Sequence, residues 1–175
     1  MSSLYLLRSL APEHNLKNFD CGKKSLNDWL KDNARRSEAK GAARTYVLCE
    51  ENEVVGYYSL SNGAVMKSHY LPQESSGLPN MIPGILIGRF AIHKARQRSG
   101  LGTKLAVDAF ENIVKVACWS GVVAAYLHVD EQSAFNFWVQ LGFQASLDDP
   151  SIDDTERKSI ELYIPVATLR KVLAE

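Results

Sequence analysis

Hydrophobic and polar positions recur with two different periods along the chain, and these periods predict alternating strands and helices. Runs rich in β-branched and aromatic residues predict strands at 4–10, 44–50, 53–65, 85–92, 122–129, from Phe143 onward and at 158–165. Apolar residues at helical spacing predict helices within 20–41 and at 101–118, 131–142 and 166–175. The resulting order, β-α-β-β-β-α-β-α-β-β, predicts an α/β fold around one sheet.

The ends of these elements carry signals of their own. Asp20 or Ser25 is expected to cap the first helix, and Gly41 is expected to end it. The Pro- and Gly-rich stretch 66–84 predicts an excursion or loop, and 148–154 predicts a second loop. Strands joined through helices are expected to be parallel, because such crossovers are right-handed.

Length and composition narrow the class of protein. The chain has 175 residues, of which 46% are hydrophobic and 23% charged, so one globular domain, 1–175, is expected. Twenty basic and twenty acidic residues balance. This balance excludes binding of nucleic acid through net charge, although a local basic patch stays possible.

Cysteine usage and hydropathy predict a cytoplasmic protein. Cys21, Cys49 and Cys118 are odd in number and widely spaced, so neither a zinc site nor a disulfide framework is expected, and no metal is predicted. Reduced thiols are the rule in the cytosol. The N-terminal residues turn polar too soon for a signal peptide, and no run of about 18 apolar residues predicts a membrane span.

The segment from Arg89 to Thr103 carries the most informative pattern. A buried strand runs into a turn with Gly100 and Gly102, and a helix begins there. Glycines let the backbone approach a ligand, and the unpaired N–H groups of a helix start hold phosphate oxygens. Basic residues that add positive charge around this turn are Lys94, Arg96, Arg98 and Lys104. The pattern is neither GxGxxG nor GxxxxGK[ST], which disfavours a dinucleotide fold or a nucleoside triphosphatase.

Two motifs resemble those of the GNAT acetyltransferases. The stretch from Gln97 to Gly102 is similar to their Q/R-x-x-G-x-G/A motif, between a strand and a helix as that motif requires. The stretch from Ala134 to Phe143 resembles the A-x-x-F-Y-x-x-x-G-F signature that closes the GNAT fold. The implied architecture is the GNAT fold, a single mixed central sheet flanked by helices.

Further segments resemble the GNAT toxins of bacterial toxin–antitoxin pairs, over about residues 4–165. In order, these segments are Phe19-Asp20-Cys21-Gly22, Leu26-x-x-Trp29-Leu30, Gly56-Tyr57-Tyr58-Ser59-Leu60 and Gly88-Arg89-Phe90-Ala91-Ile92. Members of that branch acetylate the α-amine of aminoacyl-tRNA and block translation. The resemblance therefore implies an aminoacyl-tRNA substrate, a ribbon-helix-helix antitoxin, contact with DNA only through the antitoxin complex, and a homodimer.

The resemblance also implies a site for acetyl-CoA, between the strand ending at Ile92 and the strand 122–129. The backbone near Ile92 would run beside the pantetheine arm and stabilise the oxyanion, and the turn would hold the pyrophosphate. Residues assigned to this site are Ala91, Ile92, His93, Gln97, Arg98, Ser99, Gly100, Leu101, Gly102, Thr103 and Phe137. Substrate RNA is expected to meet Arg89, and also Lys31, Arg35 and Arg36 on the basic flank of the first helix.

One position departs from the family pattern. Trp138 stands where the family has the tyrosine whose hydroxyl is thought to protonate the leaving thiolate. An indole N–H donates a hydrogen bond but does not ionise at useful pH, so it is no general acid. Three interpretations stay open: water protonates the thiolate, another hydroxyl substitutes (Tyr126, Ser133 or Tyr163), or the chain is inactive.

The chemistry of the acceptor favours an α-amine. Deprotonating a lysine amine at pH 7 costs about 4.6 kcal/mol, whereas an α-amine costs only about 1 kcal/mol. An enzyme without an obvious base therefore suits the α-amine better. Two alternatives remain, namely a GNAT enzyme for a small amine or protein amino group, and a CoA- or antitoxin-binding module without turnover.

Overall fold

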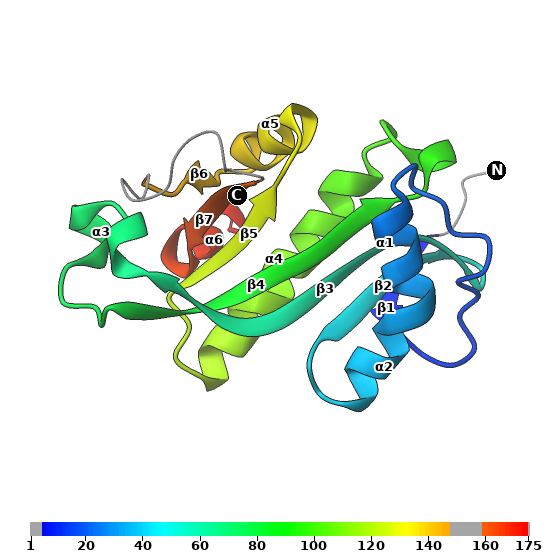
Figure 1. The fold of residues 1–175 in the computed structure, drawn as a ribbon, viewed down its shortest axis with the longest axis horizontal. Coiled ribbons are helices and arrows are strands. Elements are labelled where there is room, and N and C mark those ends of the chain that lie inside the picture. Colours follow the sequence, from blue (N-terminus) through cyan, green and yellow to red (C-terminus); the bar gives the residue numbers. More distant parts are fainter. Residues whose placement is uncertain (1–4, 148–158, 175) are drawn as a thin grey trace. The chain divides into compact units, whose positions relative to one another are not determined.

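The computed structural model describes residues 5–147 and 159–174, and within them seven strands form one mixed sheet in the order β1-β2-β3-β4-β5-β7-β6 (Figure 1). The strands are β1 (Tyr5–Ser9), β2 (Arg44–Glu50), β3 (Glu53–Met66), β4 (Met81–Ile92), β5 (Ala124–Val129), β6 (Gln144–Ala145) and β7 (Ile160–Pro165). The helices are α1 (Lys24–Asp28), α2 (Ala34–Ala39), α3 (Pro72–Ser75), α4 (Leu101–Trp119), α5 (Gln132–Gln140) and α6 (Val166–Val172). Shorter helical segments are η1 (Trp29–Asn33), η2 (Lys67–His69) and η3 (Lys94–Arg96). The predicted α/β architecture is confirmed.

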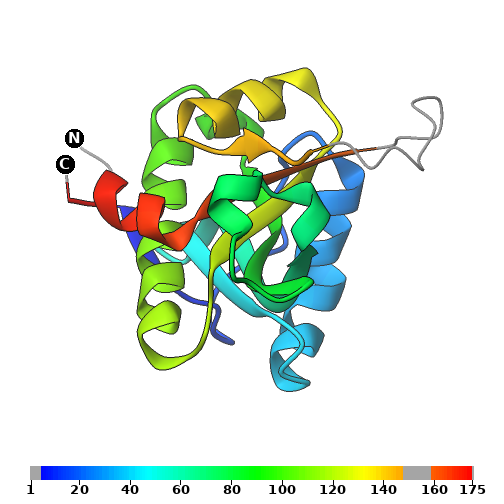
Figure 2. The ribbon, with the colours of Figure 1, turned by 90° about the vertical axis from the view of Figure 1, so that its left-hand side faces the viewer.

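The chain packs as two compact units. The first unit comprises Met1–Ser61 and Ile87–Asn112, and the second comprises Asn62–Leu86 and Ile113–Glu175. Strands β3 and β4 and helix α4 run through both units. Within the second unit, α6 continues directly from the end of β7 (Figure 2).

The expected parallel direction is present in two connections and absent in one. Strands β5 and β6, joined through α5, both pair antiparallel with the β7 that lies between them, so they run in the same direction. Strands β4 and β5, joined through α4, are parallel, with Gly84 opposite Ala124 and Leu86 opposite Tyr126. Strands β1 and β2 are joined through a helix as well, but they pair antiparallel from Tyr5–Glu50 to Ser9–Tyr46. The prediction of parallel strands is therefore wrong for this first connection.

An additional pass of the chain explains the antiparallel pair. After β1, the Leu10 N–H donates to the Thr45 carbonyl, at the end of β1 where Ser9 lies. A few residues later Asn15 forms a bridge with Glu53, beside the opposite end of β1. The helical segment then travels back in the direction of β1, so β2 has to run the other way.

The first helix differs from its predicted form. Its N-cap is Lys23, which makes no capping hydrogen bond, so neither Asp20 nor Ser25 is the cap. Asp20 instead accepts hydrogen bonds from the Gly22 N–H and the Asn27 amide, both at 2.9 Å. Gly41 ends the helix as predicted, with a φ of +67° that favours glycine. The wide π-turn η1 interrupts the helix, and the periodicity did not predict it.

The predicted excursion 66–84 is shorter than expected. Strand β3 extends to Met66 and β4 begins at Met81, and the segment between them contains η2 and α3. The strand expected after Phe143 is confirmed as the two-residue β6. The loop predicted at 148–154 lies outside the described residues.

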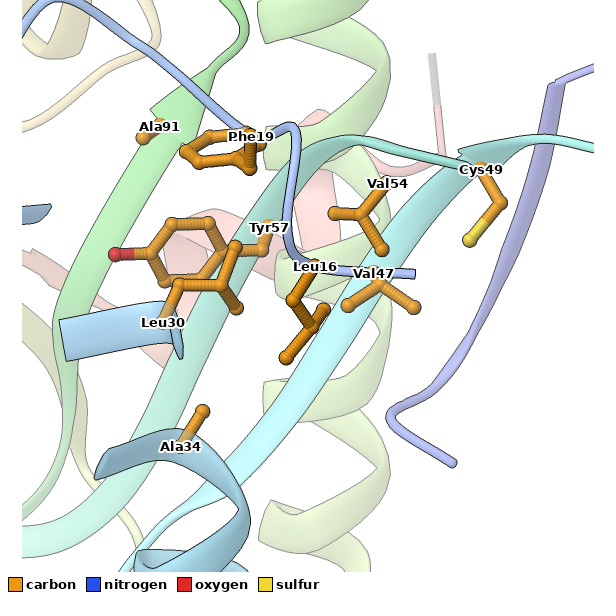
Figure 3. Close-up of a cluster of buried hydrophobic side chains, with 9 residues drawn as sticks. All are labelled: Leu16, Phe19, Leu30, Ala34, Val47, Cys49, Val54, Tyr57 and Ala91. Carbon is orange, nitrogen blue, oxygen red and sulfur yellow. The ribbon is translucent and has the colours of Figure 1, made fainter. Parts of the chain in front are cut away.

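The core of the first unit joins three strands to the first helix (Figure 3). Its buried members are Leu16, Phe19, Leu30, Ala34, Val47, Cys49, Val54, Tyr57 and Ala91. The Phe19 and Tyr57 rings meet edge to face at 5.4 Å between centroids, a favourable geometry for aromatic pairs. Burial of each large apolar side chain contributes about 1.5–3 kcal/mol to folding.

The core of the second unit gathers around tyrosines. Tyr70 and Tyr163 stack with their ring centroids 3.9 Å apart. The Tyr163 hydroxyl accepts from the Leu71 N–H at 3.1 Å and donates to Glu74 at 2.8 Å. A Cβ atom at Gly63 would lie 1.9 Å from the Tyr126 hydroxyl oxygen, so only glycine fits there.

Candidate functional site

The turn between β4 and α4 lies within the first unit and carries the predicted phosphate-binding pattern. Arg98 and Gly100 both have positive φ angles, +58° and +82°. The first hydrogen bond of α4 joins the Lys104 N–H to the Gly100 carbonyl at 3.2 Å. The three preceding N–H groups, of residues 101–103, therefore stand at the start of a 19-residue helix, where its dipole is positive. This geometry fits an anionic pyrophosphate.

Three of the four basic side chains around this turn contact the protein itself. Arg96 forms an ion pair with Glu50 at 2.8 Å, and Lys94 pairs with Asp20 at 2.6 Å. The Lys104 amine lies 6.0 Å from the centroid of the Tyr5 ring. The two ion pairs tie the turn to β2 and to the segment before α1. They are structural contacts of a kind that the sequence prediction did not include.

Residues 19–22 form a clasp on this turn. The Lys94 N–H donates to the Asp20 carbonyl at 2.8 Å, alongside the ion pair of the same two residues. The Lys94 ammonium, with the Gly22 N–H and the Asn27 amide, holds the pKa of the Asp20 carboxyl well below its usual range. The Gln97 amide donates to the Cys21 carbonyl at 3.0 Å and to the Ile92 carbonyl at 2.9 Å. Gln97 therefore shapes the turn with its side chain.

The end of β4 is the predicted path of the pantetheine arm. The His93 N–H donates to the Val55 carbonyl at 2.8 Å, so this N–H is part of the sheet. A Cβ atom at Gly56 would lie 2.7 Å from Ile92 Cδ1 and 3.4 Å from the Ala91 oxygen, which explains the glycine. The register with β5 covers only Gly84–Leu86, and β4 continues to Ile92.

Arg89 and Trp29 meet in the same unit. The Arg89 guanidinium carbon lies 5.4 Å from the centroid of the Trp29 ring, within cation–π range. The Trp29 ring in turn lies parallel to Tyr57, with centroids 6.0 Å apart and planes inclined by 6°. Trp29 is the first residue of the π-turn η1, a feature that often occurs at functional sites.

One arginine on the basic flank of the first helix also bonds the protein's own backbone. Arg35 directs its Nη2 at three backbone carbonyls, of Ala11, Pro12 and His14, the last at 2.8 Å. Its guanidinium therefore stabilises the turn that follows β1. Lys31, Arg35 and Arg36 are all exposed, and they stay predicted RNA contacts.

Trp138 lies in the second unit and is buried, with only 4% of its surface exposed. Its ring packs edge to face against Phe143 and Phe137, each at 5.1 Å between centroids. Of the hydroxyls considered in its place, Tyr163 is engaged by Leu71 and Glu74, and burial raises its pKa to about 12. Burial also raises the pKa of Tyr126. Ser133 is exposed at the start of α5.

The sequence did not predict a group of polar side chains around Glu161 in the second unit. Glu161 Oε1 lies 3.1 Å from His69 Nδ1 and 2.6 Å from Ser146 Oγ, and Glu161 Oε2 lies 4.0 Å from His128 Nε2. His128 lies on β5. The signal for its partner is the alternation along β5 and β7, which places His128 opposite Glu161. His69 is 92 residues from Glu161, so local patterns carry no signal for that contact.

No helix among the described residues is long and apolar enough to cross a membrane. Within the same residues, no group of three His, Cys, Asp or Glu side chains is placed to hold a metal ion.

Comparison with known proteins extends the sequence resemblance. The family model described as "Acetyltransferase (GNAT) family" matches residues 6–143. A protein of Mycobacterium tuberculosis (strain ATCC 25618 / H37Rv) called "tRNA-acetylating toxin" is 31% identical over 150 residues, covering 86% of this chain and 90% of the relative.

Solved structures show the same fold. AtaT complexed with acetyl-methionyl-tRNAfMet superimposes with a TM-score of 0.85 at 23% identity, covering 96% of this chain and 98% of that one. A mutant AtaT toxin bound to the C-terminus of the antitoxin AtaR and acetyl-CoA gives 0.77 at 23% identity, covering 98% and 99%. The family match over most of the length and the shared architecture agree with the turn built at residues 97–103. The chain belongs to the GNAT family of acetyltransferases.

Proposed function

We propose that this protein is an acetyl-CoA-dependent N-acetyltransferase that acetylates the α-amine of aminoacyl-tRNA and thereby blocks translation. The observation that carries the proposal is the likeness to the tRNA-acetylating toxin, 31% identical across 90% of its length. The glycine turn at the start of α4 supports the same reaction, because it presents the N–H groups that an anionic pyrophosphate needs.

Acetyl-CoA would supply the acetyl group as an activated thioester. The N–H groups of residues 98–103 would hold its pyrophosphate, and the backbone of Ala91, Ile92 and His93 would run beside the pantetheine arm. Phe137 stays a predicted contact of the cofactor. Gln97 would act through the shape of the turn, because its amide donates to the Ile92 and Cys21 carbonyls.

The acceptor amine would attack the thioester carbonyl directly. A C–N bond forms and the C–S bond breaks, the amine gives up one proton to water, and water returns one to the leaving thiolate. An N–H group near Ile92 would stabilise the oxyanion that develops on the carbonyl oxygen. Water is the proposed proton source, because the indole of Trp138 donates a hydrogen bond but does not transfer protons.

The proposed function also implies an antitoxin partner. The AtaT toxin has been solved with its antitoxin AtaR, and its fold matches this chain. We extend to this chain an antitoxin of ribbon-helix-helix type, contact with DNA only through that complex, and a homodimer. Co-expression with the protein encoded beside it, followed by light scattering of the purified complex, tests these partners.

Acetyl transfer to total charged tRNA tests the reaction. Purified protein and labelled acetyl-CoA are mixed with charged or deacylated tRNA, and nuclease digestion with mass spectrometry identifies N-acetyl-aminoacyl-adenosine. A product from charged tRNA alone is expected, and it names the amino acid. Acetyl label found on protein or on a small amine, and not on charged tRNA, would show that aminoacyl-tRNA is not the acceptor.

A further inference from the structure

Arg89 occupies an unusual place for an exposed cation. Among the described residues, no carboxylate lies within ion-pair distance of its guanidinium. The guanidinium lies over the Trp29 ring, and its Nη1 donates to the Gly88 carbonyl at 2.7 Å. A guanidinium has five N–H donors, so most of its donors and one planar face stay available to a ligand.

The surface beneath Arg89 is built firmly. Tyr57 is fully buried, its hydroxyl donates to the Leu26 carbonyl at 2.8 Å, and its ring lies parallel to Trp29. The π-turn η1 begins at Trp29, and Leu30 beside it is completely buried. Trp29 is therefore held by its stacking on Tyr57 and by its buried neighbour Leu30, and its ring gives the guanidinium a fixed support.

The Arg89–Trp29 pair also lies close to the predicted path of the thioester. Side chains two residues apart on a strand share one face, so Arg89 and the buried Ala91 lie on the same face of β4, about 7 Å apart along the strand. Ala91 and Ile92 are the residues whose backbone we assign to the pantetheine arm. A ligand group held at Arg89 would therefore lie near the acetyl group that is transferred.

We infer that the Arg89–Trp29 pair is a stacking platform for the unpaired base at the 3′ end of the substrate RNA. This inference rests on the proposed function, because it names how that substrate is held. Unstacked RNA bases bind to aromatic rings and to arginine planes, and the exposed guanidinium over Trp29 offers such a plane. The platform would position the aminoacyl ester beside the thioester, and it would tolerate different amino acids because it contacts only the nucleotide.

A binding experiment without catalysis tests the platform. The probe is an uncharged RNA hairpin ending in single-stranded CCA, compared with the same hairpin whose last nucleotide lacks its base. The wild type is expected to bind the complete hairpin about 10-fold more tightly, as stacking of one base allows. In Arg89→Ala this preference is expected to vanish, and Arg89→Lys, which keeps the charge but loses the plane, should lose most of it.

Arg36→Ala is the matched control, because Arg36 is an exposed arginine on the same helical segment as Trp29. It should weaken binding to both hairpins equally and keep the 10-fold preference. Circular dichroism of Arg89→Ala confirms that the exposed substitution leaves the fold intact. Equal binding of both hairpins by the wild type, or a full preference retained in Arg89→Ala or Arg89→Lys, would overturn the platform.

Acetyl transfer separates this inference from the proposed function. In Arg89→Ala, the KM for charged tRNA should rise about 10-fold, whereas the KM for acetyl-CoA stays unchanged. A wild type that prefers the complete hairpin but transfers no acetyl group would overturn the function and leave the platform standing. Active transfer without any preference for the complete hairpin would overturn the platform and leave the function standing. Absence of any RNA binding would overturn both the function and the platform.

Discussion

The side chain of Gln97 holds two segments of the first unit together. Its amide joins the end of β4 to the segment before α1, through the carbonyls of Ile92 and Cys21. The family motif allows Gln or Arg at this position, and both residues donate N–H groups. A donor is therefore what the position requires.

Substitutions at Gln97 should show whether the position requires a hydrogen-bond donor. Gln97→Glu places carboxylate oxygens against two carbonyl oxygens, so acetyl-CoA binding should weaken at least 10-fold and unfolding free energy should fall by about 1 kcal/mol. Titration calorimetry with acetyl-CoA and urea unfolding measure the two effects. Gln97→Arg is the control and should keep most of both, whereas unchanged binding in Gln97→Glu would contradict the assigned role.

Trp138 should prove to be a packing residue. Trp138→Phe keeps an aromatic ring against Phe143 and Phe137, so kcat should change less than 10-fold, although the lost volume costs about 1–3 kcal/mol of stability. Steady-state kinetics on charged tRNA measures kcat. Removal of a true general acid would lower it 100-fold or more, and that result would assign the indole a part in the reaction.

The site residues were only partly predictable from the sequence. Gly100 was predicted from its place before a helix, and its φ of +82° confirms a conformation that favours glycine. Lys94 and Arg96 were expected to add positive charge around the turn, and the structure pairs them with Asp20 and Glu50. Those carboxylates lie 74 and 46 residues away in the sequence, so no local pattern reveals them.

At the scale of elements, the first helix carries two arginines with different tasks. Both side chains are exposed, but Arg35 also donates to three carbonyls of the turn after β1. Arg35→Ala should lower the unfolding free energy by about 1–2 kcal/mol and leave RNA affinity nearly unchanged.

Arg36→Ala should do the opposite. It should weaken RNA binding and reduce the slope of log affinity against log salt by about 1, with stability unchanged. Urea unfolding and fluorescence anisotropy with tRNA at several salt concentrations test both variants. If Arg35→Ala lost RNA affinity without any loss of unfolding free energy, Arg35 would be an RNA contact and not a stabilising residue.

Two features of the first helix and of the strands beside it were not predictable from the sequence pattern. The amphipathic pattern predicted the first helix, but not η1, because a π-turn moves one residue without removing any apolar position from the buried face. The antiparallel pairing of β1 and β2 was also missed. It depends on the return pass to Asn15, which carries no regular periodicity.

At the scale of the whole molecule, buried tyrosines should make the protein sensitive to alkali. Burial raises the pKa of Tyr163 to about 12, and it raises the pKa values of Tyr57, Tyr58 and Tyr70 further. In the unfolded chain these groups ionise near pH 10. Their contribution to stability is therefore complete below pH 10 and is lost as the pH rises toward 12 and beyond.

Urea unfolding at pH 8, 10 and 11 should show this loss as a falling midpoint. Tyr163→Phe removes one of the ionising groups, so its stability should fall less steeply above pH 10, from a lower starting value because a hydrogen bond to Glu74 is lost. A flat profile up to pH 11 would mean that these hydroxyls ionise in the folded protein as easily as in water.

The α/β fold and the GNAT family were predictable because they depend on periodicity and on two local motifs. Residues 97–102 follow β4 and η3 and run into the first turn of α4, close to where the sequence placed them. Contacts that need a distant partner, such as His69 with Glu161 or Arg89 with Trp29, appear only when the chain is folded. The platform at Arg89 is of this second kind.

The clasp of residues 19–22 on the β4–α4 turn has a consequence for the evolution of the family. Two ion pairs and two backbone-directed hydrogen bonds fix that turn to segments that are far away in the sequence. Mutations at either member of a pair are therefore expected to persist only with a compensating change at the other. Across relatives, positions 20 and 94, and likewise 50 and 96, should covary and exchange charge together.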